Sequence, residues 1–131
     1  MKTFAVALLA LVLLMATTAW AKTIRVKFPP GRTTVILKGK TTGGPSESGG
    51  MDPIAYKVRA RKGQQMTLHL VSARKNAVFA VYLPGGMDFL EVGPNAKDWS
   101  GPLPKSGDYE IMVFPEDEAT DTTFTLEIVI R

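Results

Sequence analysis

The segment LPKSGDYEIMVF, residues 103–114, decides the fold expected for this chain. Its first half contains Pro104 and Gly107, which are residues typical of tight turns. From Tyr109 onward, apolar side chains recur at every second position, which is the period of a half-buried β-strand. The segment therefore predicts a turn that leads directly into a strand, with Tyr109, Ile111 and Val113 on one face.

The same alternation recurs on both sides of this segment. Alternating or β-branched runs cover residues 22–28, 33–37, 54–60, 65–72 and 122–131, and residues 77–83 are apolar on both faces, as in a central strand. Glycine, proline and asparagine separate these runs, and no helical period follows residue 21. The pattern predicts an all-β fold, an antiparallel, jelly-roll-like sandwich of about seven or eight strands.

The connections between these runs carry their own expectations. Lys62-Gly63 lies between two neighbouring runs and predicts a hairpin. Residues 39–50 are rich in glycine and serine, which indicates a flexible loop. Residues 87–101 have no clear period, so we expect a long surface connection there, in which Trp99 closes the end of the core.

The first 21 residues have the pattern of an export signal. Lys2 precedes an apolar run at residues 4–16, and the AWA motif at residues 19–21 fits a cleavage site. The run is shorter than the roughly 20 residues needed to span a bilayer. We therefore expect a signal peptide at residues 1–21, one domain at residues 22–131 without a membrane span, and a periplasmic or secreted product.

The residue content leaves little room for catalysis. The chain has no cysteine, and His69 is its single histidine, so it lacks the parts of a Ser-His-Asp or Cys-His site and of a cysteine-ligated zinc site. The alternation places His69 on the outward face of its strand. We therefore expect neither an enzyme nor a cofactor.

An acidic run after residue 115 is a weak candidate for a metal site. Calcium binds about six to eight oxygen ligands, and carboxylates supply them readily. The spacing fits no EF-hand, and a solvated charged turn is the alternative interpretation. The candidate residues are Glu116, Asp117, Glu118 and Asp121.

The formal net charge of +4 is too small to predict a polyanion partner, and export argues against nucleic acid. One basic row is nevertheless expected, because Lys57, Arg59 and Arg61 alternate with apolar residues. This row can bind an anionic surface or envelope polymer. The alternative is a solvated outer face that protects the sheet from edge pairing.

The Ser106–Tyr109 corner also has two interpretations. In the structural one, Ser106 bonds the local backbone, Gly107 allows a positive φ and the ring of Tyr109 packs in the core. In the functional one, the corner projects Ser106, together with Lys105 and Asp108, into the groove of a partner.

Four motifs in this order resemble a known family: YxVxAxKGQxMxL at residues 56–68, YLPGG at 82–86, LPxSGxYxIxV at 103–113 and FxLxI at 124–128. They resemble the bacterial pre-peptidase C-terminal-like β-sandwich. With a signal peptide and a single domain, the chain looks most like the periplasmic inhibitors of goose-type (g-type) lysozyme. The resemblance implies inhibition by loops inserted into the substrate groove of lysozyme, and it places Ser106, Gly107 and Tyr109 in the inserted corner.

These observations support two functions of different classes. The first is an inhibitor whose lysozyme-binding residues are Lys105, Ser106, Gly107, Asp108 and Tyr109. The second is a non-catalytic module that binds peptidoglycan or an anionic envelope polymer through Trp99 and the row of Lys57, Arg59 and Arg61. A calcium-stabilised domain of a larger assembly is a third interpretation.

Overall fold

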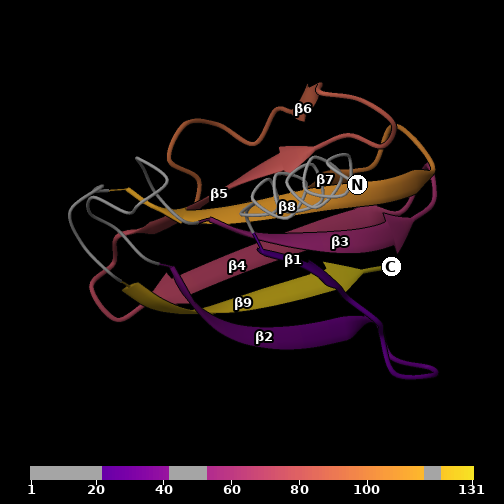
Figure 1. The fold of residues 1–131 in the computed structure, drawn as a ribbon. Coiled ribbons are helices and arrows are strands. Elements are labelled where there is room, and N and C mark those ends of the chain that lie inside the picture. The colour runs from indigo at the N-terminus through magenta and orange to yellow at the C-terminus, as the bar shows by residue number, and fades with distance from the viewer. Residues whose placement is uncertain (1–21, 42–52, 117–121) are drawn as a thin grey trace, which may run out of the picture.

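The computed structural model describes residues 22–41, 53–116 and 122–131. In these residues the chain folds into two facing β-sheets (Figure 1). The first sheet has the strand order β1-β3-β8-β5-β6, with bounds β1 (Lys22–Arg25), β3 (Ile54–Ala60), β8 (Gly107–Pro115), β5 (Ala77–Tyr82) and β6 (Phe89–Leu90). The second has the order β2-β9-β4-β7, with bounds β2 (Thr34–Thr41), β9 (Thr122–Ile130), β4 (Gln65–Ser72) and β7 (Asp98–Pro102). The predicted all-β sandwich is confirmed, with nine strands in the described part of the chain.

The core lies between the sheets and follows the predicted alternation. On β8, Tyr109, Ile111 and Val113 are completely buried. Leu126 and Ile128 of β9 meet them from the opposite sheet and are also completely buried. Burying one such side chain stabilises the fold by roughly 1.5–3 kcal/mol relative to leaving it exposed.

The predicted hairpin at Lys62-Gly63 is wrong, because β3 and β4 belong to different sheets. Strand β3 already pairs with β1 on one side and β8 on the other, so neither of its edges is open to β4. The turn instead carries the chain from one sheet to the other, and it is tied to residue 103. The N–H of Gly63 donates to the carbonyl of Leu103 at 2.9 Å, and the N–H of Leu103 donates to the carbonyl of Gln64 at 2.8 Å.

Strand β1 pairs with β3 in parallel, whereas the other described pairings are antiparallel. The parallel direction follows from the path of the chain, which crosses to β2 in the other sheet before it returns as β3. The strand ends at Arg25, earlier than the alternation over residues 22–28 suggested. The N–H of Val26 still donates to the carbonyl of Lys57 at 2.9 Å, and Val26 is buried.

Two of the expected loops contain strand. The stretch expected to be a long connection includes β6 and β7, and Trp99 lies on β7 opposite Leu68, where it packs against the core. Strand β2 continues to Thr41 through Gly39, where an added Cβ would lie 2.6 Å from the ring of Phe124. The remainder of the expected loop at residues 39–50 lies outside the described residues, as does the expected signal peptide.

Strand β8 runs from one end of the sandwich to the other. The strand begins at Gly107 and ends at Pro115, and eight steps along an antiparallel strand span roughly 27 Å. We call the end near Gly107 the Ser106 end. It gathers the β3–β4, β5–β6 and β7–β8 connections and the C-terminal Arg131, at the right in Figure 1.

In the part of the chain that the structure describes, no helix is long and apolar enough to cross a membrane.

Candidate partner-binding site

The Ser106 loop, residues 103–107, is anchored by the side chain of Tyr109. The Tyr109 hydroxyl donates to the carbonyl of Lys105 at 2.7 Å and accepts the N–H of Lys105 at 3.1 Å. One phenol therefore pairs both backbone groups of a residue four positions upstream, much like the tyrosine corner of other β-sandwiches. Because Tyr109 is completely buried, its side chain holds the loop in place, and the exposed residues of the loop face solvent.

Ser106 links this loop to the neighbouring β3–β4 turn. Its hydroxyl oxygen accepts the N–H of Lys62 at 2.8 Å. That turn is itself closed by Gln64, whose side-chain oxygen accepts the N–H of Arg61 at 2.7 Å. Ser106 is exposed, and a hydroxyl has one donor and two acceptor positions. It therefore keeps hydrogen-bonding capacity for a partner.

At Gly107 a third connection, the β5–β6 turn, packs against the loop. Its φ is +140°, and a Cβ at this position would lie 2.7 Å from the Cβ of Pro84. Only glycine fits this backbone conformation and this close approach without displacement. The β5–β6 turn, which contains Pro84, is thus packed directly onto the base of the Ser106 loop.

Asp108 is engaged in an ion pair across the outer face of the sheet. The guanidinium of Arg25, on β1, reaches over β3 and donates to both carboxylate oxygens at 3.2 and 2.9 Å. These hydrogen bonds lower the pKa of Asp108 below its ordinary value of 3.8, and the positive charges of Arg59 and Lys57 act in the same direction. The same bonds raise the pKa of Arg25. Asp108 therefore neutralises basic neighbours at the base of the loop.

The basic row predicted from the sequence is interleaved with acidic residues. Lys57 and Arg59 lie on the outer face of β3, as predicted, opposite Glu110 and Asp108 of β8. Arg61 lies beyond the end of β3, in the exposed turn at the Ser106 end. The outer face is therefore less positive than the spacing of the three cations alone suggests.

Of the four acidic candidates for calcium, the structure describes Glu116, which lies toward the other end of the molecule. Glu116 follows β8 directly, and one of its carboxylate oxygens is 3.7 Å from Nζ of Lys97. Asp117, Glu118 and Asp121 lie outside the described residues. Among the residues that the structure describes, no three histidine, aspartate or glutamate side chains are grouped to hold a metal ion.

His69 lies on the outer face of the second sheet, as its alternation predicted. Its Nδ1 contacts a carboxylate oxygen of Asp98 on β7, and both side chains are exposed. The neighbouring Thr67 and Ser100 hydroxyls are 2.9 Å apart. These pairs of polar side chains cover the outer face of β4 and β7.

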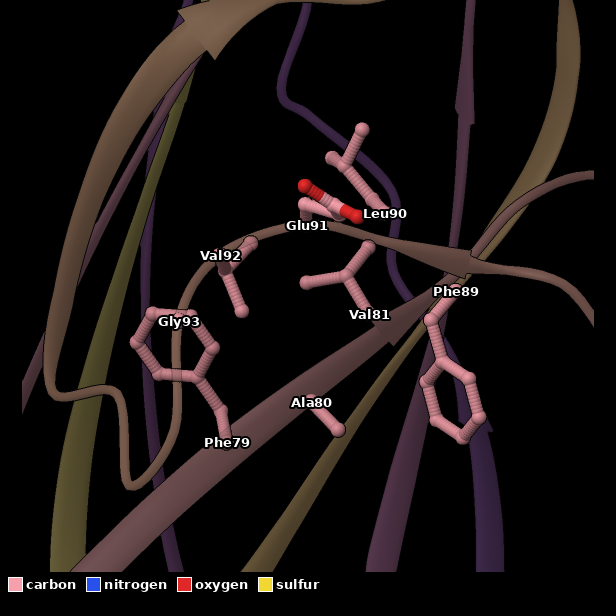
Figure 2. Close-up of a pocket in the computed structure, with 8 residues that line it drawn as sticks. All are labelled: Phe79, Ala80, Val81, Phe89, Leu90, Glu91, Val92 and Gly93. Carbon is pink, nitrogen blue, oxygen red and sulfur yellow. The ribbon is translucent and has the colours of Figure 1, made fainter.

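An apolar hollow of 310 Å³ lies beside the β5–β6 pair (Figure 2). Phe79 and Phe89 lie at its two sides, and Glu91 is the acidic residue in its lining. The full lining consists of Phe79, Ala80, Val81, Phe89, Leu90, Glu91, Val92 and Gly93. No sequence motif indicated this hollow, because it depends on how the chain after β6 folds back along β5.

Three residues that support the loop were missed by the sequence analysis: Arg25, Lys62 and Pro84. Lys62 and Pro84 lie within recognised motifs, but their spacing carries no sign that they meet residues 103–108. Arg25 had no signal at all, since its approach to Asp108 depends on the parallel pairing of β1 with β3.

No known family model matches the sequence, and a search of curated proteins finds no significant match. Solved structures do match. Aeromonas hydrophila PliG, a periplasmic lysozyme inhibitor of g-type lysozyme, superposes with a TM-score of 0.72 at 29% identity, over 86% of this chain and 98% of that one. Salmonella Typhimurium PliG, also a periplasmic inhibitor of g-type lysozyme, gives 0.62 at 23% identity, over 85% and 99%.

A third match is the pre-peptidase C-terminal domain of a collagenase from Bacillus anthracis. Its TM-score is 0.57 at 15% identity, over 85% of this chain and 96% of that domain. The two more similar proteins are inhibitors and not enzymes. The chain is therefore similar in structure to the periplasmic inhibitors of g-type lysozyme and to a pre-peptidase C-terminal domain, which confirms the resemblance seen in its sequence.

Proposed function

We propose that this protein is a periplasmic inhibitor of lysozyme, with g-type lysozyme as its main target, and that the Ser106 loop blocks the glycan-binding groove of the enzyme. The observation that supports this most is the anchoring of the loop at three points, by Tyr109, by the β3–β4 turn and by Pro84. A loop that is already ordered loses little conformational entropy on binding, which favours affinity.

The exposed part of the loop has suitable chemistry for such a groove. Lys105 and Ser106 are exposed at its tip, whereas Asp108 is paired with Arg25 at its base. Enzymes that hydrolyse glycosidic bonds generally hold two carboxyl groups on either side of the scissile bond. The ammonium of Lys105 is complementary in charge to such a groove, and the hydroxyl of Ser106 can hydrogen-bond within it.

The test is a turbidity assay of cell-wall lysis with the exported protein purified from an expressing bacterium. Goose-type, chicken-type and invertebrate-type lysozymes are assayed in parallel. We expect stoichiometric protein to stop lysis by the goose-type enzyme, and the double change Lys105→Ala with Ser106→Ala to weaken that inhibition. Lys38→Ala, an exposed lysine on β2, is the matched control. Undiminished lysis by all three enzymes would refute the proposal.

The alternative is a module that binds peptidoglycan or an anionic envelope polymer. The structure offers it less support, because Asp108 and Glu110 lie opposite Arg59 and Lys57, and Trp99 packs against the core. Sedimentation with purified peptidoglycan separates the two functions, since an inhibitor does not need to bind the polymer. The alternative would be favoured if the protein binds peptidoglycan, if salt weakens this binding, and if the double change Arg59→Ala with Arg61→Ala abolishes it.

A further inference from the structure

Large apolar side chains are exposed at four positions in the described part of the chain: Ile36 (59%), Val71 (53%), Met87 (88%) and Phe89 (56%). The first two lie on β2 and β4 of the second sheet. The other two lie close together on the β5–β6 hairpin. A large apolar side chain costs free energy when it faces water, and exposed ones that gather beside an interface are frequent binding contacts.

The β5–β6 hairpin adjoins the Ser106 loop. Strand β5 pairs with β8, with Tyr82 opposite Glu110, so the turn after β5 emerges beside the start of β8. The close approach of Pro84 to Gly107 then fixes the turn against the loop. Met87 and Phe89 are therefore on the same end of the sandwich as Lys105 and Ser106.

The hairpin is also ordered by its own contacts. The N–H of Leu83 donates to the carbonyl of Asp88 at 2.8 Å and closes the turn. The rings of Tyr82 and Phe89 lie against each other with centroids 4.4 Å apart. Phe89 is thus held in a defined place while more than half of it stays exposed, and the hollow in Figure 2 extends the apolar surface from Phe89 along β5.

The turn between these contacts carries little bulk. Pro84 is followed by Gly85 and Gly86, and the position of a Cβ on Gly85 has no neighbour within 4 Å. A partner can therefore approach the backbone closely between the Ser106 loop and Met87. The polar Ser106 loop and the apolar side chain of Met87 therefore lie on either side of a turn that has little side-chain bulk.

We propose that Met87 and Phe89 form a second, apolar contact that packs against the wall of the lysozyme groove while the Ser106 loop enters it. This rests on the proposed function and adds a set of binding residues to it. A groove that binds sugar rings presents apolar and aromatic surface to their C–H faces, and such surface suits these two side chains. Methionine adapts to irregular apolar surfaces because its side chain is flexible and polarisable.

The experiment measures the dissociation constant for g-type lysozyme by calorimetry. The test variant carries Met87→Ser and Phe89→Ser. The matched control carries Ile36→Ser and Val71→Ser, which removes two exposed apolar side chains from the other sheet. We expect binding by the test variant to weaken about tenfold or more, and the control to stay within about twofold of the unchanged protein.

Met87→Ser alone guards against a folding defect, because this side chain is 88% exposed. It should melt like the unchanged protein and still bind about threefold more weakly or worse. If the unchanged protein binds lysozyme and both Met87 variants bind it as tightly as the unchanged protein does, the apolar contact is refuted and the inhibitor function stands. If the unchanged protein binds no lysozyme, the proposed function fails and this contact fails with it.

Discussion

At the scale of single residues, the Tyr109 hydroxyl connects the core to the Ser106 loop. The ring is completely buried and the hydroxyl pairs with both backbone groups of Lys105. The structural and functional interpretations of this corner are therefore compatible, because the buried ring keeps the exposed tip in one conformation. Tyr109 acts in the proposed inhibitor as a positioning residue.

Tyr109→Phe should weaken inhibition without emptying the core. The ring stays, so no large cavity forms, but two hydrogen bonds are lost, which costs about 1–2 kcal/mol of unfolding free energy. Tyr56→Phe is the control, because Tyr56 is a buried tyrosine whose ring packs against Phe124 away from the loop. Urea unfolding and the turbidity assay measure the two effects. Equal inhibition by both variants would contradict the anchoring role.

Gly107→Ala should destabilise the protein by about 1–3 kcal/mol, since it combines a strained φ with a collision against Pro84. Gly63→Ala separates the two causes. Gly63 also has a positive φ, +92°, but a Cβ there meets nothing within 4 Å. Thermal unfolding should therefore show the larger loss for Gly107→Ala, and equal losses would mean that the contact with Pro84 contributes nothing.

At the scale of elements, strand β1 depends on one pairing and one ion pair. Among the described residues it lies at the edge of the first sheet and pairs with β3, while Arg25 reaches past β3 to Asp108 on β8. This ion pair joins three strands at the base of the Ser106 loop. Its side chains are 46% and 32% exposed, so its contribution to stability is modest.

The Arg25–Asp108 pair should make stability depend on pH in the acid range. The pKa of Asp108 is lowered in the folded protein from 3.8, so the pair stabilises the fold above that value. The stabilisation is lost as the pH falls through the lowered pKa. Asp108→Asn should therefore lower the melting temperature at about pH 7, and this effect should shrink as the pH falls below 3.8. A difference that persists unchanged at the acid end would contradict this, and Glu91→Gln, an exposed carboxylate outside this pair, is the control.

At the scale of the whole molecule, the two ends of the sandwich carry different chemistry. The Ser106 end presents Arg61 and Lys105 beside Met87, whereas Glu116 begins the connection at the opposite end. Glu116, the described member of the acidic run, therefore lies about the length of strand β8 away from the proposed site. It is too distant to share a single groove contact with the Ser106 loop.

Reversing charge at the Ser106 end should weaken inhibition, while the same change at the other end should not. Arg61→Glu with Lys105→Glu places like charges against the carboxylates expected in a glycosidase groove, so we expect inhibition to weaken about tenfold or more. Arg74→Glu with Lys75→Glu, in the exposed turn after β4, is the matched control, because it also reverses two positive charges. The turbidity assay gives both values, and an equal loss from this control would indicate a nonspecific effect of net charge.

The sequence by itself determined the strands and their faces. Alternation placed Tyr109, Ile111 and Val113 inside and Lys57 and Arg59 outside, and the structure agrees. It could do so because the choice of face depends on whether each side chain prefers water or the core, which is a local property of each residue. The fold class and the family resemblance followed from the same positions.

Only the tertiary structure decided which strands meet. The crossing at residues 61–64, the parallel pairing of β1 and the packing of Pro84 on Gly107 were not visible in the sequence. The physical reason is that alternation gives each strand a face but no partner. Partners are selected by contacts between residues far apart in the chain, and these contacts assemble the Ser106 loop with the turns that support it.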